Sequence, residues 1–233
     1  MDSLTATYRR NMDAKQHRIY NQESLNCGPR VAEGRCQIVD IFAESNCDWL
    51  WMVDSDMTFE EDALDMMLET AHNEDVKIVG GLCFAGRADS RMFPTIYELF
   101  PVEEEGHEGE WGTRVIEDYP KDQPIKVGAT GAAFMLVHRD VFVEMQRKFG
   151  VLPNGMPNPY PWFVEASNGG KPFGEDIAFC LRAKACGFDI VVDTRIKIGH
   201  VKNVVLTEEG FERQEAKKNK VSTKALKLPE VAP

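Results

Sequence analysis

The chain has 233 residues, of which 43% are hydrophobic and 28% are charged, a mixture that excludes a fibrous or wholly disordered protein. Its formal net charge of −11 argues against a general nucleic-acid coat protein, because such proteins need a basic surface that displaces counterions. No run of about 18 apolar residues is present, and the N-terminal segment lacks the apolar core of a secretory signal. We therefore expect a cytoplasmic protein with no membrane span.

Six cysteines are scattered through apolar stretches, and no two of them have the C-x-x-C spacing of a zinc site or a redox pair. A disulfide framework or a zinc site is the less favoured alternative. We expect reduced, mostly buried thiols at Cys27, Cys36, Cys47, Cys83, Cys180 and Cys186.

The first half of the chain alternates helical and strand patterns. Apolar residues in 31–46 recur at near-helical spacing, and the short apolar run 49–54 is typical of a strand buried on both faces. Thr58 is a candidate N-cap for a following helix, whose buried stripe falls within 63–68. A second buried strand is expected at 76–82, and the alternation predicts an α/β layered sheet.

The middle of the chain begins with a polar stretch. Residues 101–124 are rich in Glu, with Gly and Pro, and are interpreted as a surface insertion or hairpin. A glycine-rich turn in 127–139 leads into a strand, and a short helix is expected from Asp140 to Phe149. The prolines of 154–163 predict a loop.

The last elements are a helix over 174–187, ended by Gly187, and two strands within 188–193 and 196–201. We expect residues 1–206 to form one domain, and 207–233 to form a peripheral helix and a loose C-terminal tail.

Two aspartates follow the first predicted strand. Asp54 and Asp56 form a D-x-D pair where a buried strand ends, which is the position at which ligands collect in open α/β sheets. Their oxygens suit Mg²⁺ or Mn²⁺ bridging phosphates. The alternative is a solvated turn with a helix cap.

Three further features are candidates for the same site. His200 follows a strand pattern and could be a third metal ligand, the alternative being a structural histidine. Glu175 and Asp176 open a helix, where they either complement its dipole or supply a general base. Trp162 and Phe163 resemble a stacking platform for a sugar, with core packing as the alternative.

Taken in order, four segments resemble a known family. They are GRCQIV, DWLWMVDSDM, GATGAAFMLVHRDVF and GEDIAFCLRAKACGFDIVVDTRIKIGHV, and the likeness spans roughly residues 28–205. Together they are similar to metal-dependent glycosyltransferases of the GT-A fold, of the broad family 2-like kind often encoded by phages and bacteria. The resemblance implies a Rossmann-like mixed sheet flanked by helices, and a catalytic role for the domain.

The resemblance also implies residue roles. Asp54 and Asp56 would bind the metal and the nucleoside diphosphate, His200 would complete the metal site, and Asp176 beside Glu175 would be the catalytic carboxylate. The turn from Gly128 to Gly131 would border the donor sugar, while Arg35 resembles a basic residue near the nucleotide; Trp162 is the stacking candidate named above.

The implied reaction is transfer of a sugar from a nucleotide sugar, such as a UDP- or GDP-sugar, with inversion favoured over retention. The acceptor is open among a saccharide, a modified DNA base, a lipid and a protein. Family members begin with a hydrophobic strand that carries the base-binding loop. No such strand precedes the N-terminal MDSLTATYRR, so we expect the first strand to be absent through a truncated start, or replaced.

Two alternatives remain. DSDMT matches the D-x-D-x-T motif of haloacid dehalogenase-like phosphatases, in which the first aspartate, here Asp54, is phosphorylated. The chain could also be a non-catalytic module that binds a nucleotide or a sugar.

Overall fold

A five-stranded sheet in the order β1-β10-β3-β13-β8 organises the computed structural model, which describes residues 7, 19, 22–26, 28–86, 92–103, 110–168 and 171–201. The expected peripheral helix and tail at 207–233 lie outside these residues. The five strands are β1 (Trp49–Val53), β10 (Phe134–His138), β3 (Ile78–Leu82), β13 (Ile190–Lys197) and β8 (Pro124–Val127).

The sheet is mixed but mostly antiparallel. β10 is antiparallel to both β1 and β3, β13 is parallel to β3, and β8 is antiparallel to β13. The predicted α/β class with a mixed sheet is therefore present, but the Rossmann-like arrangement that the resemblance implied is not confirmed. One consequence is that β1, β3 and β13 all run in the same direction.

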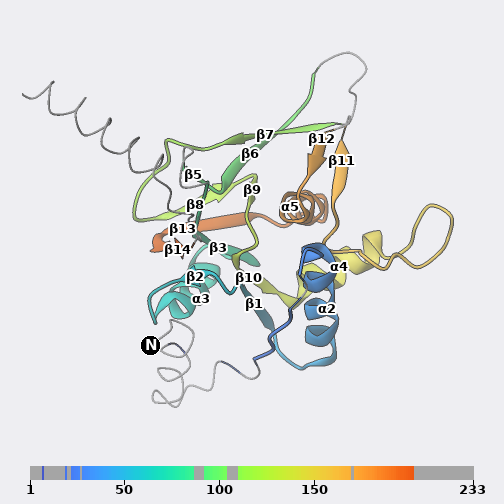
Figure 1. Ribbon diagram of the computed structural model, residues 1–233, viewed down its shortest axis with the longest axis horizontal. Coiled ribbons are helices and arrows are strands. Elements are labelled where there is room, and N and C mark those ends of the chain that lie inside the picture. Colours follow the sequence, from blue (N-terminus) through green and yellow to red (C-terminus); the bar gives the residue numbers. More distant parts are fainter. Residues whose placement is uncertain are drawn as a thin grey trace, which may run out of the picture. The chain divides into compact units, whose positions relative to one another are not determined.

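Helices cover both faces of this sheet (Figure 1). α3 (Ala63–Asn73) packs on one face, and α2 (Val31–Glu44), α4 (Arg139–Phe149) and α5 (Glu175–Ala185) pack on the other. Alternate residues of each strand pack against the helices on the two faces, because successive side chains of a strand point to opposite faces. In β3, for example, Ile78 joins the cluster of α2, α4 and α5, whereas Val79 joins the cluster of α3.

Small antiparallel pairings frame the main sheet. A hairpin is formed by β6 (Ile96–Pro101) and β7 (Trp111–Val115), and β9 (Ala129–Thr130) pairs with β6. The second strand of this hairpin, β7, lies within the stretch 101–124 that was expected to be a surface insertion or hairpin, whereas its first strand, β6, lies almost wholly before it. The remaining pairs are β2 (Met57–Thr58) with β14 (Gly199–His200), β4 (Phe84–Ala85) with β5 (Phe93–Pro94), and β11 (Ala166–Asn168) with β12 (Lys171–Phe173).

Three local predictions were wrong. Thr58 does not cap a helix, because it pairs with Gly199 in a β-ladder, and α3 begins only at Ala63. β1 is an edge strand with only Met52 fully buried, not a strand buried on both faces. The two expected final strands are largely one, β13, with an irregular register between Asp193 and Lys197.

Other expectations agree with the structure. α2, α4 and α5 begin and end within two residues of the predicted bounds, and Gly187 has the positive φ of +89° that glycine tolerates after a helix. Cys36, Cys83 and Cys180 are buried free thiols, and Cys47 and Cys186 are free and partly buried. Within the described ranges, no helix is long and apolar enough to cross a membrane.

A buried ionic network ties β13 to α3. Asp193 is fully buried; it accepts a 2.6 Å hydrogen bond from Thr70 Oγ1 and a 2.7 Å one from Arg195 Nη2. Burial raises the pKa of Asp193, but the hydrogen bonds from Arg195 and Thr70 outweigh burial and hold the pKa below its usual range. The stabilisation is therefore present above the unfolded pKa of about 4 and is lost as the pH falls through the lower folded value.

Removing the Thr70 hydroxyl should destabilise the fold. We expect Thr70→Val to lower the free energy of unfolding by about 1–3 kcal/mol, because a buried carboxylate and Arg195 both lose a partner. Urea denaturation at neutral pH measures this. The matched control is Thr113→Val on exposed β7, which should stay within about 0.5 kcal/mol of wild type. Equal effects of the two changes would contradict this account of the network.

Candidate active site

The carboxyl ends of three strands meet at one edge of the sheet. Because β1, β3 and β13 share a direction, the residues that follow them lie together: Asp54 and Asp56 after β1, Phe84 after β3 and His200 after β13. β10 starts at the same edge, where the Asp54 amide donates a 2.9 Å hydrogen bond to the Ala133 carbonyl.

His200 reaches Asp56 across this edge. The β14–β2 pairing places His200 opposite Met57, and the Val201 amide donates to the Asp56 carbonyl at 2.8 Å. His200 Nε2 then lies 3.0 Å from Asp56 Oδ2, and Nδ1 lies 2.9 Å from the Phe84 carbonyl oxygen. A carbonyl oxygen only accepts hydrogen bonds, so Nδ1 carries the donated proton, and Nε2 is the ring nitrogen turned toward the carboxylate.

Arg35 of α2 holds the second carboxylate. Its Nη2 lies 3.3 and 3.2 Å from the two oxygens of Asp54, and its Nε lies 3.6 Å from Glu175 Oε1. The guanidinium is 5.8 Å from the centre of the Phe163 ring. Arg35 is only 9% exposed, and its Nη1 is buried with no hydrogen-bond partner in the part of the chain that the structure describes.

Charges of both signs act on Asp54, whose side chain is partly exposed. Burial raises its pKa, as do the negative charges of Asp56 and Glu175, whereas Arg35 and His200 oppose the rise. Like charges gathered at one edge disfavour each other's ionised forms. A nearby positive charge favours the ionised form of Asp54, and Arg35 supplies one.

Asp176 lies at the N-terminus of α5, which begins at Glu175 after Gly174. Its Oδ1 accepts a 2.8 Å hydrogen bond from the Ile177 amide. A Cβ on Gly174 would lie 2.7 Å from that oxygen, so glycine there leaves space for the carboxylate. Burial raises the pKa of Asp176, and Glu175 raises it further. Both acids also suit the helix dipole, as the alternative interpretation held.

Sequence reasoning missed Tyr97. Its pKa is raised by burial and, to a lesser extent, by the negative charge of Asp176, so the two groups interact electrostatically. Tyr97 lies in β6, in an alternating strand pattern that carries no motif, so no sequence signal distinguishes it from an ordinary strand tyrosine.

Trp162 is not a stacking platform. It is 7% exposed and belongs to the core, where its indole N–H donates a 3.0 Å hydrogen bond to the Phe142 carbonyl. Phe163 is fully buried and stacks on Phe179 with ring centres 4.5 Å apart. The core alternative is correct for both, because the Pro-rich segment folds its aromatic residues inward.

Gly128 and Gly131 have different surroundings. A Cβ on Gly128 would lie 2.4 Å from the Leu99 amide nitrogen, so this glycine permits close contact with β6. A Cβ on Gly131 would lie 3.7 Å from Asp176 Oδ2, an ordinary contact. Of the two residues expected to border a donor sugar, only Gly131 adjoins the carboxylate of the candidate base.

The donor set fits a divalent cation in part. Asp56 and His200 present an oxygen and a nitrogen 3.0 Å apart, and the Phe84 carbonyl orients the imidazole as a second partner does in metal sites. Asp54, the third expected ligand, is engaged by Arg35 instead. Among the described residues, no group of three or more His, Cys, Asp or Glu is arranged to hold a metal ion.

Among known proteins, the chain has distant likenesses to solved structures. No protein-family profile and no curated protein sequence matches the chain. Similar solved structures include A197 from STIV, with 17% identity, a TM-score of 0.48, and coverage of 77% of this chain and 71% of that one. They also include GalNAc-T7 with UDP, GalNAc and Mn²⁺, with 14% identity, a TM-score of 0.43, and coverage of 76% of this chain and 31% of that one. At these values neither likeness bears on the activity of this chain.

Replacing Gly128 or Gly131 by alanine should change the free energy of unfolding by different amounts. We expect Gly128→Ala to lower the free energy of unfolding by about 1–3 kcal/mol, because its Cβ would collide with backbone. Gly131→Ala should cost less than about 0.5 kcal/mol, since Thr95 and Asp176 leave room for it. Denaturant unfolding of both variants measures this, and a Gly128→Ala protein as stable as wild type would refute the close contact with β6.

Proposed function

We propose that this chain transfers a sugar from a nucleoside-diphosphate sugar to an acceptor hydroxyl. The observation that carries the proposal is the meeting of Asp56 with His200 at 3.0 Å. Asp54 lies at the same edge, and Arg35 joins it to Glu175 at the N-terminus of α5. These are the residues to which the family resemblance assigns metal, nucleotide and catalytic roles, and they come from four separate segments of the sequence.

Asp176 is the proposed general base. Its carboxylate would accept the proton of the acceptor hydroxyl while that oxygen forms a bond to the anomeric carbon. The bond from the anomeric carbon to the diphosphate breaks, and its electron pair leaves with the nucleoside diphosphate. Attack from the face opposite the leaving group gives inversion. The raised pKa of Asp176, caused by burial and by Glu175, makes its carboxylate a stronger base than an exposed aspartate.

Arg35 is the proposed diphosphate-binding residue. A buried guanidinium nitrogen without a hydrogen-bond partner costs free energy, so a bound anion that accepts from Nη1 would remove that cost. The same side chain separates the negative charges of Asp54 and Glu175. Arg35 thus has the position and the unused donor that an anionic donor substrate requires.

Asp56 and His200, with Asp54 once released from Arg35, are the residues proposed to hold Mn²⁺ or Mg²⁺, which when bound would supply positive charge to the diphosphate. Gly131 is the proposed neighbour of the donor sugar. Residues 1–206 are proposed to make up the catalytic domain. The nucleotide is proposed to be UDP or GDP, and the acceptor a saccharide, a modified DNA base, a lipid or a protein.

The phosphatase alternative assigns Asp54 as a nucleophile. Its carboxylate contacts a guanidinium nitrogen at both oxygens, an arrangement that lowers the reactivity of an oxygen nucleophile. That alternative also leaves the Asp56–His200 contact without a role. The transferase proposal assigns that contact to the metal site.

The role of Asp176 as general base is tested by measuring turnover and nucleotide-sugar binding separately. We expect wild-type protein to release nucleoside diphosphate slowly from one nucleotide sugar by transfer to water, and Asp176→Asn to lose roughly a hundredfold or more of this rate. Calorimetry should give a similar dissociation constant for both proteins, because the amide keeps the shape of the site.

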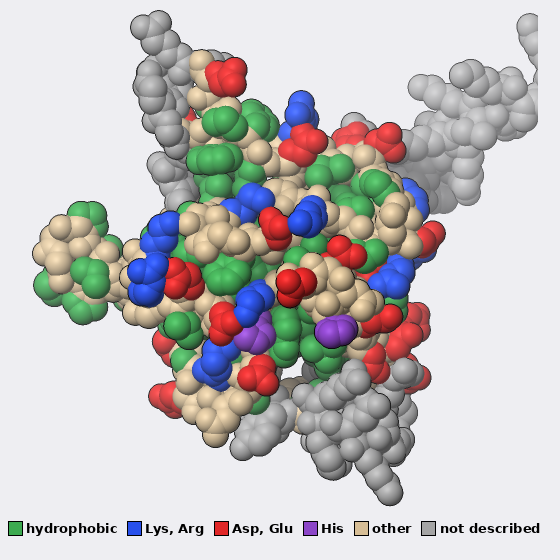
Figure 2. Space-filling view, turned by 180° about the vertical axis from the view of Figure 1, so that it is seen from behind, with side chains coloured by type: hydrophobic (Ala, Val, Ile, Leu, Met, Phe, Trp, Pro, Cys, Tyr) green, Lys and Arg blue, Asp and Glu red, His purple; other side chains and the backbone are tan. Residues whose placement is uncertain are grey.

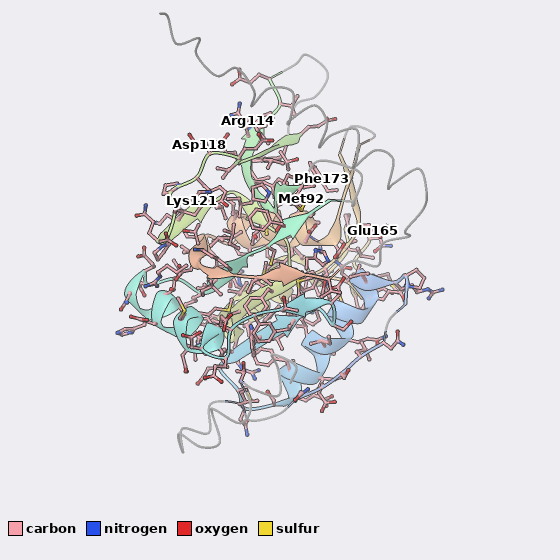
Figure 3. The ribbon with its side chains drawn as sticks, turned by 60° about the vertical axis from the view of Figure 1, so that its left-hand side comes forward. Met92, Arg114, Asp118, Lys121, Glu165 and Phe173 are labelled. Atoms are coloured by element: carbon pink, nitrogen blue, oxygen red, sulfur yellow. The ribbon has the colours of Figure 1, made fainter. Side chains whose placement is uncertain are left out.

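Asp118→Asn is the matched control. Asp118 is exposed near Arg114 and Lys121, away from Phe173 at the start of the segment that leads to Asp176 (Figure 3). This variant should keep the wild-type rate. Loss of nucleotide binding in Asp176→Asn equal to its loss of turnover would remove Asp176 from the role of base.

A further inference from the structure

A hydrogen-bonded hairpin, residues 151–158, leaves the end of α4 and projects from the rest of the described chain (Figure 1). Val151 and Pro157 form a β-bridge, and the Leu152 amide donates to the Met156 carbonyl at 2.8 Å. The Gly155 amide donates to the Leu152 carbonyl at 2.8 Å, with φ of +81° at Gly155. These bonds close the turn, so the segment has a defined shape. We call it the apolar hairpin.

The base of the apolar hairpin is fixed to α4 and α5. Asn158 donates from its backbone to the Gly150 carbonyl and from its side chain to the Phe149 carbonyl, each at 2.8 Å. Arg182 of α5 donates to the Tyr160 carbonyl at 2.7 Å and lies over the Phe149 ring. The hairpin therefore projects from a rigid base.

The side chains of the apolar hairpin are exposed although most are hydrophobic. Val151 is 66% exposed, Met156 is 60% exposed and Leu152 is 37% exposed, and Pro153 and Pro157 are exposed beside them. The amide oxygen of Asn154 is used within the turn, where it accepts from the Met156 amide at 3.1 Å. Single exposed apolar residues are ordinary, but a contiguous group on a projecting tip marks an interaction surface.

Cations surround the base of the apolar hairpin. Arg147 and Lys148 end α4, and Lys184 lies near the end of α5, all three exposed. Lys148 Nζ donates to the Ala185 carbonyl, which brings the two helix ends together. Facing acids are Glu144, paired with Arg147, and Asp189, paired with Lys126. Figure 2 shows the lobe at the left of the view with hydrophobic side chains over it, and Lys and Arg side chains beside its stem together with an acidic one.

We propose that the apolar hairpin docks the protein onto an anionic membrane surface. Val151, Leu152 and Met156 enter the interface between headgroups and acyl chains, and Arg147, Lys148 and Lys184 face lipid phosphates. The occupant is a membrane because the tip is projecting and apolar while Lys148, Lys184 and the Glu144-paired Arg147 give its base a net positive charge, in a chain whose net charge is −11. A basic collar beside an apolar tip is complementary to anionic headgroups above a hydrocarbon layer.

The test is flotation of the full chain with vesicles of phosphatidylcholine, with or without phosphatidylglycerol. We expect the wild-type protein to float with the vesicles that contain phosphatidylglycerol and to be released by raised salt. The triple variant Val151→Ser, Leu152→Ser, Met156→Ser should bind about tenfold more weakly or worse, because the apolar contact is gone. The matched control is Val143→Ser, which removes an apolar side chain that is 59% exposed on α4 outside the hairpin, and should bind like wild type.

A second variant separates charge from apolar contact. Arg147→Gln with Lys148→Gln should weaken binding to anionic vesicles and remove most of its salt dependence, while circular dichroism shows an unchanged fold. Failure of the wild-type protein to float, or equal flotation of the triple variant, would overturn the proposal. Concentration-dependent dimerisation that the triple variant abolishes would overturn it in favour of a contact between two copies of the chain.

Discussion

The contact between Asp56 and His200 depends on strand direction, because 144 residues separate them and only the sheet brings them together. β1 and β13 run in the same direction, so the segments that follow them leave the sheet at the same edge. The short β2–β14 pairing then fixes how these two segments align. β3, β10 and β13 are apolar on both faces and hold this geometry. Each strand packs against α3 on one face and against α2, α4 and α5 on the other.

The second constraint is charge. Asp56 and Glu175 lie close enough to Asp54, and Glu175 close enough to Asp176, to raise the pKa of Asp54 and of Asp176, which is a cost to their ionised forms. Arg35 offsets part of that cost by pairing with Asp54 and Glu175, at the price of leaving one of its own nitrogens unsatisfied. On the proposed function, these carboxylates, His200 and the Arg35 Nη1, which has no partner among the described residues, would receive a cation and an anion together.

The amino-acid sequence was sufficient to locate most helices and the strands that carry Asp54 and His200, because apolar periodicity and glycine at a helix end are local signals. It could not predict that β1 is an edge strand or that the sheet is mostly antiparallel, since pairing partners are set by contacts far apart in the chain. Trp162 was misassigned because a Pro-rich, polar context resembles an exposed loop, whereas its indole N–H finds a buried carbonyl. Tyr97 was missed because its electrostatic interaction with Asp176 arises only in the folded chain.

The most direct measurement is a nucleotide-sugar hydrolysis screen with UDP-, GDP-, CDP- and dTDP-sugars, each with Mn²⁺, with Mg²⁺ and with EDTA. The account predicts that one nucleoside diphosphate is released in the presence of a divalent cation, and that Asp56→Ala and His200→Ala abolish its release. Thr113→Val, which alters only an exposed strand, should leave the rate unchanged. Absence of release from every donor, together with turnover of a generic phosphate ester that depends on Asp54, would contradict the transferase assignment and favour the phosphatase.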